Sequence, residues 1–128
     1  MRAVCLFLIL SAPLAAEELT VSSPAELVGV DGVEFSGNTI LFPERWTCRI
    51  LQETTEPGFV TCRNGRVTGN RIVFRRGQLR SDVNVGGGTA AETFGFEGNR
   101  WFAADRPAAS RPQLPMAEQG GIYGQDPR

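Results

Sequence analysis

Short runs in which apolar and polar residues alternate fill the middle of the chain, from Val30 to Ala104. This period of two, with abundant Val, Ile, Phe, Thr and Trp, predicts β-strands, and the Gly, Asn and Pro between the runs predict turns. A short helix is predicted only at 23–28, where Ser23 suits the N-cap and Pro24 the first position. The predicted strands are 33–36, 39–42, 46–52, 59–63, 71–75, 78–85, 92–97 and 100–104.

A Gly-Asn pair recurs in three of these runs: VEFSGNTILF (33–42), RVTGNRIVF (66–74) and GFEGNRWFA (95–103). Gly-Asn suits a two-residue type II′ hairpin, because glycine readily takes the positive φ of the first central position. The repeats therefore predict three hairpins, with Phe35 opposite Ile40 in the first. A parallel β-helix also uses Asn-rich turns, but the chain lacks a regular period and is short for that architecture.

The predicted fold is all-β, with about six to eight short antiparallel strands in a meander that closes as a small barrel or a two-layer sandwich. A further turn signal at Asn64 and Gly65 is interpreted as a bulge in a longer strand, 59–68. The residues predicted to point into the core are Phe35, Ile40, Trp46, Ile50, Val60, Val67, Ile72, Phe74, Phe96 and Trp101.

The cysteines Cys48 and Cys62 are predicted to form one internal disulfide. If 46–52 and 59–64 pair as an antiparallel hairpin, the two cysteines face each other at a distance that a disulfide can bridge. Closing a loop of about 15 residues would then contribute about 3 kcal/mol. A reducible redox bridge is the alternative, but no neighbouring residue is arranged to lower a thiol pKa.

The first sixteen residues, MRAVCLFLILSAPLAA, have the pattern of a signal peptide. Arg2 is followed by an apolar run at 3–10 and by small residues up to Ala16. The run is shorter than the about 20 residues that a membrane-spanning helix needs. The sequence therefore predicts a periplasmic or secreted protein with no transmembrane segment, from which Cys5 is removed with the leader.

From Asp105 onward the chain is rich in proline and glycine and poor in large apolar residues, which is typical of a disordered tail. The predicted organisation is a signal peptide at 1–16, a lead-in segment at 17–29, a β domain at 30–105 and a disordered tail at 106–128.

The basic residues are all arginine, and the chain has no lysine and no histidine. The absence of histidine excludes Ser-His and Cys-His nucleophilic dyads and removes the commonest metal ligand, so no metal and no cofactor are predicted. Residues 45–80 hold eight arginines and two glutamates. On the predicted strands, one exposed face carries Arg49, Arg63, Arg71 and Arg75.

Arginine side chains bind carboxylate and phosphate groups through paired hydrogen bonds. The sequence therefore favours an exported, non-enzymatic binding or accessory protein. Its arginine face either contacts an anionic envelope component or an acidic partner protein, and not nucleic acid, or is an ordinary solvated face paired with Glu34 and Glu44. The alternative is a small carboxylate-dependent hydrolase of cell-envelope glycans that uses Asp82, Glu92 and Glu97. No catalytic motif supports that alternative, and the protein is predicted not to be an enzyme.

Overall fold

The computed structural model describes residues 20, 21, 23–52, 54 and 56–128. The predicted signal peptide and the first residues of the lead-in lie outside the described residues. No described helix is long and apolar enough to cross a membrane. The described residues include two 3-10 helices, η1 (Ala91–Thr93) and η2 (Pro107–Ala109). The strands are β1 (Thr20–Val21), β2 (Ala25–Val28), β3 (Glu34–Ser36), β4 (Thr39–Leu41), β5 (Cys48–Leu51), β6 (Arg66–Thr68), β7 (Arg71–Phe74), β8 (Val83–Val85), β9 (Gly95–Glu97), β10 (Arg100–Ala103) and β11 (Ile122–Tyr123).

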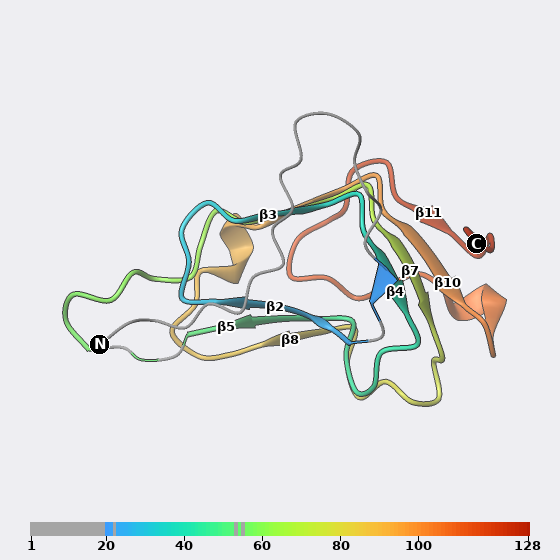
Figure 1. Ribbon diagram of the computed structural model, residues 1–128, viewed down its shortest axis with the longest axis horizontal. Coiled ribbons are helices and arrows are strands. Elements are labelled where there is room, and N and C mark those ends of the chain that lie inside the picture. The colour runs from blue at the N-terminus through green and yellow to red at the C-terminus, as the bar shows by residue number, and fades with distance from the viewer. Residues whose placement is uncertain (1–19, 22, 53, 55) are drawn as a thin grey trace.

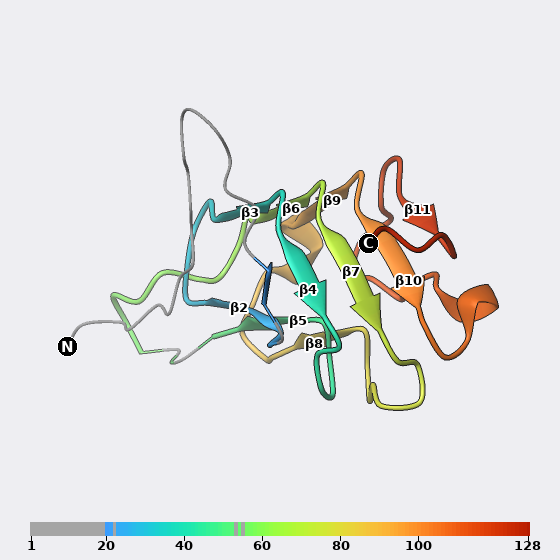
Figure 2. The same ribbon diagram turned by 45° about the vertical axis from the view of Figure 1, so that its right-hand side comes forward.

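The strands pair into three sheets, and every pairing between the described strands is parallel. The five-stranded sheet has the order β1-β4-β7-β10-β11. The other two have the orders β2-β5-β8 and β3-β6-β9, and we call them the β5 sheet and the β6 sheet after their central strands. In Figures 1 and 2 the three sheets form three sides of the molecule.

The chain passes through the three sheets in turn and then repeats the circuit. β2, β3 and β4 form the first coil, β5, β6 and β7 the second, and β8, β9 and β10 the third. This arrangement is a short parallel β-helix (Figure 2). The predicted antiparallel meander, closed as a barrel or sandwich, is therefore wrong. Alternation of period two is the same in parallel and antiparallel strands, so it does not reveal which strands pair.

The three Gly-Asn pairs form the corner at which each coil passes from the β6 sheet to the five-stranded sheet. Their glycines have φ angles of 67°, 62° and 63°, which glycine adopts without steric cost. The chain does not fold back there, and the predicted hairpins are wrong. Phe35 instead lies beside Val67, which lies beside Phe96, while Ile40 lies beside Ile72 of the next coil.

The asparagines of these corners stack into a buried ladder. The backbone N–H of Asn38 donates to Oδ1 of Asn70 at 2.9 Å, across 32 residues of sequence, and the N–H of Asn70 donates to Oδ1 of Asn99 at 3.0 Å. Nδ2 of Asn70 donates to the carbonyl oxygen of Phe35 at 3.0 Å. The ladder thus satisfies backbone groups that a buried corner would otherwise leave unpaired.

The ladder ends on Glu118, which follows the third coil. Its Oε1 accepts hydrogen bonds from the N–H and Nδ2 of Asn99, at 3.1 and 2.6 Å. Its Oε2 accepts from the indole Nε1 of Trp101 at 2.9 Å and from the hydroxyl of Tyr123 at 3.1 Å. One carboxylate therefore satisfies four donors at the end of the stack.

Residues 106–128, predicted to be a disordered tail, instead lie against this end of the molecule. β11 pairs with β10, and Gln119 forms a parallel bridge with Glu97. Leu114 and Tyr123 pack against the core. The composition of the segment was misleading because its few apolar side chains complete a core that the coils already provide.

The core lies between the three sheets, and the inward residues of successive coils stack in rows. Two predicted core residues differ from expectation: Trp46 is half-buried and Val60 is 49% exposed. Val60 lies in an irregular connection before β6 and not in a strand. The other eight are buried, namely Phe35, Ile40, Ile50, Val67, Ile72, Phe74, Phe96 and Trp101.

Two local predictions are also corrected. The helix predicted at 23–28 is absent, and β2 occupies Ala25–Val28 and pairs with β5. Asn64 and Gly65 do not form a bulge but the corner that leads into β6, where Asn64 has a φ of 56°. Gly65 has no room for a side chain, because a Cβ there would lie 2.1 Å from Cε1 of Phe94.

The predicted Cys48–Cys62 disulfide is also wrong, because both cysteines are buried free thiols. Cys48 in β5 lies beside Ala25 and Val83 of the adjoining coils, and not opposite Cys62. The Cys62 thiol donates to the carbonyl oxygen of Leu27 at 3.4 Å. The prediction assumed an antiparallel hairpin, whereas β5 has parallel neighbours on both sides.

Candidate functional site: an arginine corner

Arg49 lies on the outer face of β5, in the β5 sheet. Its Nη1 is 3.1 Å from Oε1 of Glu26, its register neighbour on β2, and the two form an ion pair. Its guanidinium carbon also lies 4.6 Å from the centre of the Trp46 ring. The charge of Arg49 is therefore already balanced within its own sheet.

Arg63 lies at a different corner, between the β5 and β6 sheets. Its Nε is 2.9 Å from Oδ2 of Asp31, and Nδ2 of Asn64 donates to Oδ1 of the same carboxylate at 2.7 Å. These two hydrogen bonds, that from Asn64 being the larger effect, hold the pKa of Asp31 below its ordinary value of 3.8. Arg63 is thus also paired with a carboxylate.

The other two predicted arginines belong to the five-stranded sheet. Arg71 is in register with Thr39 and with Arg100 on the neighbouring strands. Arg75 directly follows β7, and its guanidinium carbon lies 4.3 Å from the centre of the Phe42 ring. The structure therefore places Arg71 and Arg75 on a different sheet from Arg49, and the four do not share one face. Whether any of them binds an anion stays a prediction.

Other arginines come together where the coils leave the five-stranded sheet. The segments 42–47, 75–82 and 104–110 all begin at the end of that sheet. Arg45 and Leu79 form a parallel bridge, and the backbone N–H of Arg80 donates to the carbonyl oxygen of Arg45 at 2.7 Å. We call this region the arginine corner and define it by its four exposed arginines, Arg45, Arg75, Arg80 and Arg106.

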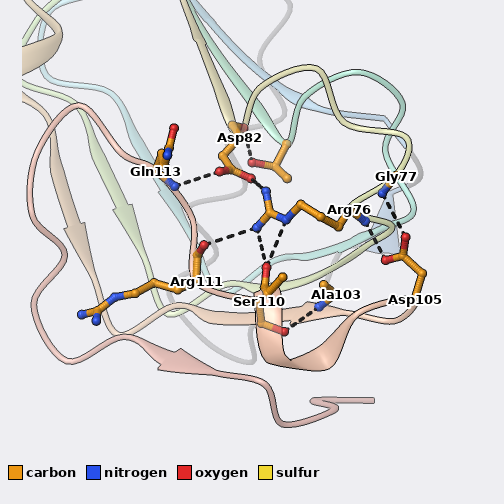
Figure 3. Close-up of polar contacts among 10 residues, drawn as sticks. Arg76, Gly77, Asp82, Ala103, Asp105, Ser110, Arg111 and Gln113 are labelled. Carbon is orange, nitrogen blue, oxygen red and sulfur yellow. Dashed lines mark hydrogen bonds and ion pairs between the residues drawn. The ribbon is translucent and has the colours of Figure 1, made fainter.

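A buried network holds the corner in shape (Figure 3). Arg76 forms an ion pair with Asp82, whose side chain is only 6% exposed. Nη2 of Arg76 also donates to the carbonyl oxygen of Ala109 at 2.7 Å, and Oδ2 of Asp82 accepts from the N–H of Gln113 at 2.8 Å. The network therefore links the second coil to residues 106–128, which we call the C-terminal segment.

Asp105 joins the second and third coils at the same place. Its carboxylate accepts hydrogen bonds from the backbone N–H groups of Arg76, at 2.7 Å, and Gly77, at 2.9 Å (Figure 3). These bonds, that from Gly77 being the larger effect, hold the pKa of Asp105 below 3.8. Arg106 follows directly and is thereby placed beside the second coil.

The corner carries an excess of positive charge. Its three segments contain five arginines and three acidic residues. Asp82 is bound to Arg76, whereas Glu44 and Asp105 are exposed, and Asp105 accepts hydrogen bonds from backbone amides. In the described part of the chain, none of the four exposed arginines forms an ion pair.

The carboxylates considered for hydrolysis lie in separate elements. Asp82 precedes β8 and is bound to Arg76, Glu92 lies in η1, and Glu97 ends β9. Both glutamates are exposed. Among the described residues, no three Cys, Asp or Glu side chains are grouped so that they could hold a metal ion.

The sequence prediction missed Arg45, Arg80 and Arg106. No local pattern connects them, because 42–47 and 75–82 are adjacent only after the chain has completed a coil. The available signal was the spacing of the Gly-Asn pairs, which gives the length of a coil. Adding the first Gly-Asn spacing to position 45 gives a position within 75–80. Adding the second spacing to that position gives one at or near Arg106.

Comparisons with protein-family models, with curated proteins and with solved structures found no match to this chain.

Proposed function

We propose that this protein is an exported, non-enzymatic binding protein that contacts an anionic envelope component or an acidic partner protein through the arginine corner. Export is supported by the N-terminal sequence, with its short apolar run and small residues before Glu17. Acting in the periplasm or outside the cell, the protein would meet phosphate and carboxylate groups of lipids, glycans and proteins.

The observation that carries this proposal is the convergence of Arg45, Arg75 and Arg80 from two successive coils. All three are exposed and, among the residues that the structure describes, none forms an ion pair, whereas Arg49 and Arg63 are each paired with a carboxylate. Guanidinium groups that are not neutralised locally attract anions and bind them through two parallel hydrogen bonds. The arrangement favours binding over catalysis, because guanidinium groups do not transfer protons near neutral pH.

The test is binding of the chain that starts at Glu17 to phosphatidylglycerol vesicles and to an acidic cell-wall fraction, at low and at above-physiological salt. We expect binding that weakens steeply with salt, because exposed charges are screened over about 10 Å at 0.1 M. Arg75→Gln with Arg80→Gln should weaken binding about tenfold or more, the loss expected when two charge-assisted contacts are removed.

The matched control is Arg49→Gln with Arg63→Gln, which changes the net charge by the same amount but alters arginines that are already paired. This double variant should bind nearly as well as the unmodified chain. Salt-independent binding, or equal losses in the two double variants, would show that the arginine corner is not the binding site.

A further inference from the structure

We infer that the preferred ligand of the arginine corner is a linear polyanion, of the acidic polysaccharide class, which lies along the stacking direction of the coils. This inference rests on the proposed function and specifies its ligand. It depends on the positions of the arginines in successive coils and not on their total charge.

The corner contains arginines from all three coils. Arg45 comes from the first coil, Arg75 and Arg80 from the second, and Arg106 from the third. Adjacent parallel strands lie about 4.8 Å apart, so arginines from three coils span about 10 Å along the stack. A single phosphate or carboxylate is too small to contact all of them, whereas a chain with repeated charges can do so.

The row of charge is also narrow. On the five-stranded sheet, the nearest register row consists of Leu41, Val73 and Phe102 and is apolar, while the exposed Arg71 and Arg100 lie two residues farther along their strands. On the other side lies the β5 sheet, where Arg49 is neutralised by Glu26. An apolar register row and a neutralised arginine are thus the nearest neighbours of the corner, and a row bounded in this way matches a linear polymer better than the broad plane of charge that a lipid surface presents.

Arginine provides the chemistry for a carboxylate polymer. Each guanidinium offers a planar pair of N–H donors that fits one carboxylate. The half-buried Phe42 ring lies 4.3 Å from the guanidinium carbon of Arg75 and 5.8 Å from that of Arg128, so it holds arginine side chains in this corner. A uronic-acid polymer presents carboxylates at regular intervals, so successive carboxylates can reach successive arginines of the row.

The experiment compares ligands that differ only in length, namely galacturonic acid, its trimer and its polymer, with dextran as the neutral polymer and phosphatidylglycerol vesicles as the lipid alternative. The dissociation constant per ligand should fall at least about tenfold from monomer to trimer, because the added carboxylates bind with a high effective concentration. Dextran should not bind.

Variants at the two ends of the row give the sharper test. Arg45→Gln with Arg106→Gln should remove most of the gain in affinity from monomer to trimer. Arg66→Gln is the control, because Arg66 is exposed on β6, in a different sheet. It should leave the length dependence intact.

Two outcomes separate this inference from the proposed function. Equal affinity for monomer, trimer and polymer, together with vesicle binding that Arg75→Gln and Arg80→Gln weaken, would overturn the polymer inference and leave the proposed function standing. Failure of every anionic ligand to bind in a corner-dependent way would overturn both.

Discussion

Individual polar residues stabilise this fold by forming hydrogen bonds with buried backbone groups, and the buried asparagines are the clearest case. Asn38, Asn70 and Asn99 are 8%, 0% and 0% exposed, although asparagine is usually a surface residue. Each occupies the same corner of a different coil. Their side chains replace the hydrogen bonds with water that the backbone loses when the corner is buried.

Asn70→Ala tests the ladder at its centre. The change leaves the N–H of Asn38 and the carbonyl oxygen of Phe35 without their partner, and both bonds are buried. Since an unsatisfied buried group costs about 1–3 kcal/mol, we expect the free energy of unfolding to fall by at least about 2 kcal/mol. Equilibrium urea unfolding measures this.

The control for this experiment is Asn84→Ala, because Asn84 is half-buried on β8 and its side chain accepts one long hydrogen bond, of 3.4 Å, from Arg49. It should lose less than about 1 kcal/mol, because only one long, partly exposed hydrogen bond is removed. Similar losses in the two variants would contradict the role of the ladder.

The thiols give a prediction with a defined pH range. Burial raises the pKa of Cys48 from 9.0 to about 12, and the nearby Cys62 adds a smaller effect. Between pH 9 and about 12, this thiol is therefore neutral in the folded state but ionised in the unfolded state. The corresponding contribution to stability is therefore fully present below pH 9 and is lost as the pH rises from 9 toward 12.

For the chain that starts at Glu17, we accordingly expect Cys48 and Cys62 to resist alkylation at pH 8 in the folded protein. Both should be alkylated after unfolding in urea without a reductant. Mass spectrometry counts the modified thiols. An unfolded chain that is alkylated only after reduction would contradict the structure, because it would reveal a disulfide.

Among the elements, the C-terminal segment closes the exposed end of the stack. β11 extends the five-stranded sheet, and Glu118 ends the asparagine ladder. Arg76 and Asp82 fasten the beginning of the same segment. A stack of identical coils would otherwise expose unpaired backbone groups and apolar side chains at its last turn.

Glu118→Gln tests this closure with little change in shape. Four donors face the carboxylate, and an amide in its place directs its own N–H groups toward some of them. We expect the free energy of unfolding to fall by about 1–3 kcal/mol. Glu97→Gln, at an exposed position on β9, is the control and should have little effect.

The same variant has a spectroscopic signature. The pKa of Tyr123 is raised above 10.0, first by burial and then by the charge of Glu118 and its hydrogen bond. Removing that charge should lower the pKa of Tyr123, although the effect of burial remains. Tyr123 is the only tyrosine, so ultraviolet titration follows it directly. An unchanged titration curve would contradict the contact.

At the scale of the whole molecule, the local elements and much of the core could be predicted, but their pairing could not. Residues such as Phe35, Ile72 and Trp101 point inward as their alternation predicted. Each of them packs against the equivalent residue of a neighbouring coil and not across a hairpin. The disulfide prediction failed for this reason, since it needed a hairpin to bring its cysteines together.

The sequence by itself determined the β character, most of the inward positions and the positive φ of the glycines in the Gly-Asn pairs, because these depend on side-chain alternation and on local φ angles. Tertiary structure alone decided that the strands run parallel, that Asn38 and Asn70 stack, and that Arg45 and Arg80 become neighbours. Such contacts form between residues about one coil apart, and alternation of period two fits parallel and antiparallel partners equally well. Only the packing of one complete coil on the next selects between them.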